Sequence, residues 1–249
     1  MLGGRPVTAQ SPSPSFDPQA IVGRMEQCNA QRSNELHSYL SRRRYDASNS
    51  FLRRRAYVVV EARFDAAKGK DFRVIERGGS GTVERRVFVP MLETERANAL
   101  SPGREEVEIS RRNYTFTFES YDAARQAYVF KAEPHTKNKY LLRGKIWINA
   151  ADSAIQRIEG EPAQRPSFWV RRTRFTHEYS KFGGFWFPVS NRTEVDLFLF
   201  GHSNFGIDYF DYQWEPRIEN GCTAPPLAFQ PPPGVSARSG EDSSRVQPR

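Results

Sequence analysis

The feature of this sequence that most constrains its fold is a repeated alternation of apolar and polar residues with a period of two. It is clearest over residues 56–64, where small, branched and aromatic apolar residues alternate with Glu61 and Arg63. A half-buried strand has this pattern, because successive side chains of a strand point to opposite faces of a sheet. The same alternation recurs over residues 114–119, 128–130, 140–148 and 185–199.

Short turn sequences separate these expected strands. They are Gly78-Gly79-Ser80-Gly81, Asp122-Ala123, Asn149 to Asp152 and Gly183-Gly184. Strands joined by short turns pair antiparallel, since parallel pairing needs a long crossover after each strand. We therefore predict one large antiparallel sheet, and a sheet with so many strands should curl.

Two helices are expected beside the sheet. Asp17 can cap a helix that starts at Pro18, whose missing N–H costs nothing at the first helical position. Apolar residues at helical spacing extend this long N-terminal helix to Leu40, with a break near residues 29–34, and a short helix is expected over residues 90–100. The predicted fold class is α+β, a large curved antiparallel sheet covered by the long N-terminal helix and the short helix.

The chain divides into one folded region and two polar ends. Residues 1–16 are rich in Gly, Pro and Ser, and residues 223–249 are rich in Pro. Such segments cannot bury enough apolar surface to offset their ordering entropy, so we expect both to be disordered and residues 17–222 to form a single domain. No stretch approaches the roughly 20 apolar residues of a membrane-spanning helix.

Catalytic motifs are lacking in the sequence. Thr82 stands where a nucleophile elbow around Ser80 would need its second Gly, and we interpret residues 78–81 as a hairpin turn. His177-Glu178 lacks the second His of a zinc-binding helix, and no phosphate-binding glycine loop occurs. We expect no enzyme activity, no cofactor and no metal.

The basic charge comes almost wholly from arginine. Of 37 Lys and Arg residues only 7 are Lys, and the formal net charge is +8. Clusters such as Arg42-Arg43-Arg44, Arg53-Arg54-Arg55 and Arg171-Arg172 suit anionic headgroups, a membrane surface or an acidic partner, or form a solvated outer face. Nucleic-acid binding is not expected, because stacking aromatics should share a face with the arginines, whereas the best-patterned aromatics here lie on the apolar face.

Two cysteines, Cys28 and Cys222, lie near the ends of the predicted domain. They form either one long-range disulfide in an oxidising compartment or two unrelated buried thiols. The N-terminus shows no apolar signal-peptide core, yet Val7 to Gln10 and the following Ser/Pro run are typical of sequence just after a cleavage site. We hypothesise that Met1 is a late start that omits an export signal.

Three segments carry a family resemblance. They are Lys139 to Asn149 with Asp152 and Ile155 to Gly160, then Tyr179 to Pro188, and Ile207 to Tyr212. They resemble hairpins of the LolA/LolB-like outer-membrane lipoprotein-sorting proteins. The resemblance implies a half-open β-barrel whose mouth the helices close, a cavity for lipid acyl chains, and a periplasmic location. There is no lipobox Cys near the start, which favours a soluble carrier over an anchored receptor.

We therefore expect a non-enzymatic periplasmic carrier or chaperone that holds acyl chains of a lipid or lipoprotein in an apolar cavity. Rigid aromatic rings on a curved sheet can hold such a cavity open. The apolar face of the strands predicts as lining residues Val58, Val60, Phe116, Phe118, Phe130, Leu142, Ile146, Ile148, Phe185 and Phe187. The alternative is a structural or sensory protein-interaction module of the same fold with a filled core. Oligomeric state, ligand identity and partner have no signal in the sequence.

Overall fold

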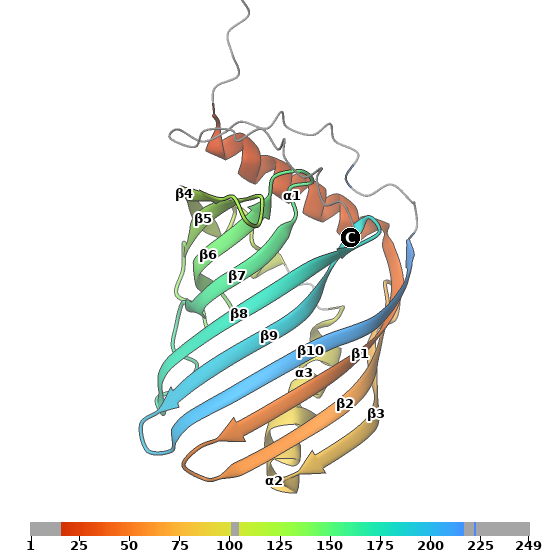
Figure 1. Ribbon diagram of the computed structural model, residues 1–249, viewed down its shortest axis with the longest axis vertical. Coiled ribbons are helices and arrows are strands. Elements are labelled where there is room, and N and C mark those ends of the chain that lie inside the picture. Colours follow the sequence, from red (N-terminus) through yellow and green to blue (C-terminus); the bar gives the residue numbers. More distant parts are fainter. Residues whose placement is uncertain (1–15, 101–104, 217–221, 223–249) are drawn as a thin grey trace, which may run out of the picture.

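The computed structural model describes residues 16–100, 105–216 and 222, and its strands form one antiparallel sheet (Figure 1). The strands are β1 (Leu36–Asn49), β2 (Arg54–Asp65), β3 (Gly69–Gly79), β4 (Tyr114–Asp122), β5 (Ala127–Pro134), β6 (Leu142–Asn149), β7 (Ile155–Pro162), β8 (Val170–Phe182), β9 (Phe185–Leu197) and β10 (Gly201–Pro216). Their order is β3-β2-β1-β10-β9-β8-β7-β6-β5-β4. The sheet is curved and unclosed, with β3 and β4 as its edges.

Two helical segments cover the sheet. The first is α1 (Pro18–Glu35), capped by Asp17, whose carboxylate accepts a hydrogen bond from Gln19 N at 2.9 Å. The second runs without interruption through α2 (Gly81–Val83), η1 (Glu84–Phe88) and α3 (Val89–Asn98). In Figure 1, α1 lies across the upper end of the sheet and α3 lies behind β10, β1 and β2. The predicted α+β class, curved antiparallel sheet and helix cover are confirmed.

The inner face of the sheet holds two apolar cores, one under each helical segment. Under α1, Ile21, Val22 and Met25 pack against inward residues of β4 to β7. Under η1, Phe88 packs against Tyr45 of β1 and against apolar residues of β2 and β10. Each helix is therefore held in place by its own buried cluster.

The predicted extent of the N-terminal helix is wrong. The helix ends at Glu35, and Leu36 and Leu40 belong to β1, which the sequence analysis missed. The inner face of β1 carries Tyr39, Ser41, Arg43 and Tyr45, so it is largely polar. A strand whose buried face contains Ser and Arg shows no apolar alternation.

The second helical segment begins earlier than expected, and the strand before it, β3, is not expected from the sequence. Gly78 and Gly79 end β3 and helix follows from Gly81, so the expected hairpin turn at residues 78–81 is wrong. The short helix expected over residues 90–100 corresponds to α3, and the helical residues 81–88 before it are not expected from sequence. Gly79 has a φ of +86°, and a Cβ there would lie 2.3 Å from the Arg55 carbonyl oxygen. Strand β3 is an edge strand that is exposed along most of its length, which explains why it lacks a hydrophobic pattern.

The other predicted turns are confirmed, since Asp122, residues 149–152 and Gly183-Gly184 each lie at the turn between consecutive paired strands. Of the two predicted tails, residues 1–15 and 223–249 lie outside the described residues. Phe16, the last residue of the predicted N-terminal tail, packs against Phe118 with ring centroids 4.7 Å apart, so its place in a disordered tail is wrong. The single-domain boundary of 17–222 stays a prediction.

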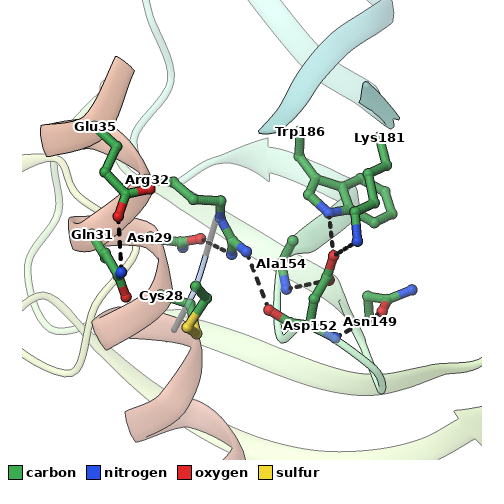
Figure 2. Close-up of a disulfide and its surroundings, with 11 residues drawn as sticks. Cys28, Asn29, Gln31, Arg32, Glu35, Asn149, Asp152, Ala154, Lys181 and Trp186 are labelled. Carbon is green, nitrogen blue, oxygen red and sulfur yellow. Dashed lines mark hydrogen bonds and ion pairs between the residues drawn. A yellow bond between two sulfur atoms is a disulfide. The ribbon is translucent and has the colours of Figure 1, made fainter. Parts of the chain in front are cut away.

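Cys28 and Cys222 are joined by a disulfide that spans 194 residues of sequence, with their Cα atoms 5.0 Å apart. The bond links α1 to the chain that follows β10, so the first and last described elements are covalently connected (Figure 2). Within the described ranges, no helix combines the length and apolar character needed to cross a membrane.

We predict that reduction of this disulfide destabilises the protein by about 2–5 kcal/mol, because the bond restricts the unfolded chain over a very long loop. The measurement is urea unfolding with and without reductant. The double variant Cys28→Ser/Cys222→Ser should match the reduced protein and should not respond to reductant. Equal stability of oxidised and reduced protein would contradict the prediction.

Two histidines provide a test of the β8–β10 region. Burial lowers the pKa of His177 on β8. The pKa of His202 on β10 is raised, because the His202 ring hydrogen-bonds the Asp196 carboxylate at 2.8 Å. A raised pKa means that folding favours the charged form of His202. The His202–Asp196 pair therefore stabilises the fold below the unfolded-state pKa of the histidine, and this stabilisation is lost as pH rises through the raised folded-state pKa. NMR titration should give a higher pKa for His202 than for His177. The substitution Asp196→Asn should lower the pKa of His202 and leave that of His177 unchanged.

Candidate ligand-binding groove

A groove runs between the helices and the inner face of the sheet. It consists of two adjoining cavities of about 430 and 360 Å³, and Tyr39 of β1 lines both. Ser33 and Leu36, at the C-terminal end of α1, also line both. The second cavity extends to Glu95, Asn98 and Ala99 at the end of α3.

The cavity under α1 is mainly apolar. Its apolar and aromatic lining residues are Leu36, Tyr39, Ile109, Ala154, Ile155, Ile158, Tyr179, Phe185, Trp186, Phe187 and Pro188. Arg32 is its one charged lining residue, and Asn29 and Ser33 join Arg32 from α1. A hollow of about 550 Å³ elsewhere has several charged lining residues, among them the ion pairs Arg44–Asp46 and Arg192–Asp208.

Stacked aromatic rings form the wall where the cavities meet. Tyr39 stacks on Phe64 with centroids 5.1 Å apart and contacts the edge of Phe187 at 5.7 Å. Phe187 stacks on Tyr212 of β10 at 4.6 Å. Such rings bury a large area with few rotatable bonds, so they keep the shape of the wall fixed.

A buried guanidinium lies at the base of this wall. The side chain of Arg43 is 4% exposed, and it donates to the hydroxyl of Tyr39 at 3.1 Å and to the carboxylate of Glu95 on α3 at 2.9 Å. Lys70 of β3 reaches the same carboxylate at 2.7 Å. Burial raises the pKa of Glu95, but Arg43 and Lys70 outweigh burial and hold it below its usual value. This network fastens α3 to the inner face.

A second polar network fastens α1 beside the groove (Figure 2). Arg32 donates to the backbone oxygen of Asp152 at 3.1 Å and to Asn29 at 3.1 Å. The Asp152 carboxylate accepts from Trp186 Nε1 at 2.9 Å and pairs with Lys181 at 2.9 Å. The β6–β7 turn, the β8–β9 hairpin and α1 are thus held together at the edge of the groove.

The structure places the predicted lining residues in three groups. Phe185 and Phe187 line the groove. The remainder lie in the two cores: Val58 and Val60 under η1, and Phe116, Phe130, Leu142, Ile146 and Ile148 under α1, with Phe118 packed against the latter. Ligand contact by this remainder stays a prediction.

Several groove residues were missed by the sequence analysis. Tyr39 lies in the part of β1 that is expected to be helical from sequence, and Arg43 lies in the part of β1 for which no element is expected. Tyr179 was noted only within a hairpin resemblance, although burial raises its pKa to about 12 and it lines the groove. The alternation of Tyr39, Ser41, Arg43 and Tyr45 was the available signal. In the described part of the chain, no cluster of three or more His, Cys, Asp or Glu side chains could hold a metal.

Comparison with solved structures gives distant similarities. A putative outer membrane lipoprotein-sorting protein domain from Vibrio parahaemolyticus is 10% identical with a TM-score of 0.39, over 77% of this chain and 92% of that one. LolA superfamily protein NE2245 from Nitrosomonas europaea is 11% identical with a TM-score of 0.37, over 81% and 94%. A DUF1329 family protein from Desulfovibrio piger is 11% identical with a TM-score of 0.42, over 80% and 94%.

Neither the family models nor the curated proteins give a match to this sequence. Two of these structures are named as an outer membrane lipoprotein-sorting protein domain and a LolA superfamily protein. At such identities and TM-scores, the assignment of a ligand depends on the groove itself.

We predict that Glu95→Gln destabilises the fold by roughly 1–3 kcal/mol at neutral pH, because it removes a charged partner from the buried Arg43 guanidinium. The lowered pKa of Glu95 makes its contribution complete above the unfolded-state pKa and lost as pH falls through the folded-state pKa. In urea unfolding, the difference in free energy of unfolding between the variant and wild type should therefore shrink as the pH is lowered through the acidic range. Glu93→Gln, at an exposed position of α3, is the control and should have little effect at any pH.

Proposed function

We propose that the groove binds an apolar chain, as a periplasmic carrier of lipid or lipoprotein acyl groups would. The observation that carries this proposal is the aromatic cavity under α1, in which Arg32 is the one charged lining residue. Ligand pockets usually have volumes of about 300–1,000 Å³ and apolar walls with few polar groups. Both cavities of the groove lie in that range.

The polarity of the groove changes along its length. The cavity under α1 is apolar, whereas Lys70, Glu95 and Asn98 line the adjoining cavity beside α3. An amphiphile fits this gradient with its chain against Phe187 and its polar head beside α3. Each buried CH₂ would contribute about 0.8 kcal/mol before ordering costs.

The disulfide supports an extracytoplasmic location for this activity. Disulfides form and persist in oxidising compartments, among them the bacterial periplasm. Cys28 lies in α1 near Arg32, at the edge of the groove, so reduction would loosen the helix that covers the proposed ligand.

The direct experiment is native mass spectrometry of the protein purified from its source host, followed by lipid extraction. The proposal expects a bound amphiphile that is released on denaturation. A protein that carries no lipid and takes up no fluorescent apolar probe would contradict the carrier function and would favour a protein-interaction module with a filled core.

We predict that Ser33→Trp blocks uptake of the fluorescent probe N-phenyl-1-naphthylamine. Ser33 is exposed on α1 and lines both cavities that meet under that helix, so an indole there fills the groove without disturbing a core. Affinity should fall at least about tenfold, which corresponds to roughly 1.4 kcal/mol. Asn34→Trp is the matched control, because Asn34 is the exposed neighbour and lines neither cavity. Equal affinities for the two variants, both folded by circular dichroism, would place the probe elsewhere.

A further inference from the structure

Seven large apolar side chains are exposed together at one end of the sheet. We call this set the aromatic tip: Phe51, Leu52, Phe168, Trp169, Phe198, Leu199 and Phe200. Their exposed fractions range from 42% for Phe200 to 81% for Phe168. They come from the β1–β2 turn, the β9–β10 turn and the end of the β7–β8 connection, and the two turns lie at the foot of the sheet in Figure 1.

Hydrogen bonds and ring contacts join the three segments. Asn49 Nδ2 donates to the carbonyl of Phe200 at 2.9 Å, and Ser50 N donates to the carbonyl of His202 at 3.0 Å, which ties the β1–β2 turn to the β9–β10 turn. Phe198 N donates to the carbonyl of Trp169 at 3.1 Å. The rings of Phe51 and Phe200 lie 6.5 Å apart and those of Phe168 and Phe198 6.4 Å apart. The tip is therefore one continuous apolar surface on a fixed frame.

Exposed arginines flank the tip on both sides. Arg53, Arg54 and Arg55 follow Leu52, while Arg165, Arg171 and Arg172 bracket Phe168 and Trp169. None of these six guanidiniums bonds to another residue of the described chain. Many arginines elsewhere are paired, as Arg43 is with Glu95 and Arg111 with Glu26.

A basic cavity of about 400 Å³ lies directly beside the tip. Lys137, Arg143, Arg165, Arg171 and Arg172 line it, with Glu161 as its one acidic residue. Thr173, which also lines it, has a buried hydroxyl without a hydrogen-bond partner among the described atoms. Arg143 pairs with Glu133, and Asp196 on β9 hydrogen-bonds His202 and also interacts with Arg171 and Arg172. The surroundings of the tip therefore carry more positive than negative charge, with basic residues outnumbering the acidic ones around this cavity.

We propose that the aromatic tip docks this protein on the surface of a bilayer that contains anionic phospholipids. Trp and Phe rings favour the boundary between headgroups and acyl chains, and guanidiniums form paired hydrogen bonds with phosphate oxygens. A bilayer of this kind is apolar in its interior and anionic at its surface. The aromatic turns of the tip match the apolar interior, and the surrounding arginines match the anionic surface. A large exposed apolar patch on a chain of this composition also needs a partner to cover it.

The tip lies far from the groove. Phe51 lies in the turn that follows β1, about 12 residues after Tyr39, which at roughly 3.3 Å per residue corresponds to at most about 40 Å. Docking through the tip would leave the groove away from the membrane surface. Loss of membrane docking therefore does not imply loss of ligand binding in the groove, and the reverse also holds.

The test is co-sedimentation with vesicles of phosphatidylcholine alone or of phosphatidylcholine mixed with phosphatidylglycerol. We expect binding to the mixed vesicles only, weakened by added salt because salt screens the exposed guanidiniums. The triple variant Phe168→Ser/Trp169→Ser/Phe198→Ser should bind at least about tenfold more weakly. The control Val74→Ser/Ile75→Ser removes exposed apolar side chains from the edge strand β3 and should bind like wild type.

A second pair of variants separates local charge from net charge. Arg171→Glu/Arg172→Glu and Arg85→Glu/Arg86→Glu change the net charge equally, and all four side chains are exposed. Only the first pair lies at the tip, so only that variant should lose binding. Equal losses would show that binding follows overall charge and would overturn the proposal.

The depth to which the aromatic tip enters the bilayer can be measured by quenching of tryptophan fluorescence with brominated lipids. Trp169 is the exposed tryptophan of the tip, so it should dominate quenching, and Trp169→Phe should retain binding while losing most of the signal. No binding of the wild type to mixed vesicles would overturn the proposal. So would light scattering that shows a dimer abolished by the triple variant, since the tip would then cover a second copy of the chain.

Discussion

The pairing of β1 with β10 is the contact on which the rest of this structure depends. It runs from Leu36 opposite Pro216 to Asn49 opposite Ser203 and joins the two ends of the described chain. Through it, β1 to β3 and β4 to β10 become one sheet, with β3 and β4 at opposite edges. The chain between these edge strands has to pass over one face of the sheet, and the helix that ends in α3 is part of that passage. The disulfide between Cys28 and Cys222 reinforces the same closure covalently.

The inner face of β1 also explains why a groove lies between two filled cores. Tyr45 belongs to the core under η1, while Arg43 and Tyr39 carry polar groups that need partners. A buried guanidinium is tolerated only when it is paired, and Glu95 on α3 provides the partner. Apolar packing stops where this polar pair begins, and the aromatic rings around Tyr39 surround the remaining space.

Much of the fold could be predicted from local sequence, because strands with one apolar face, such as residues 56–64, show their period directly. Strand β1 could not, since its inward Ser41 and Arg43 are satisfied by contacts that form only in the folded chain. The site was harder to predict. Alternation identifies an inward residue but does not distinguish Phe187, which faces a cavity, from Phe130, which is sealed in a core. That difference depends on where α1 and α3 lie, which local periodicity does not specify.

The most direct test of the central claim is to locate a bound chain by NMR. Isotope-filtered NOE spectra of labelled protein with an unlabelled fatty acid report which side chains touch the chain methylenes. We expect contacts from Leu36, Tyr39 and Phe187, which line the cavity under α1. Contacts confined to Phe51, Phe168 and Phe198, or no contacts from a folded protein at saturating ligand, would contradict the account.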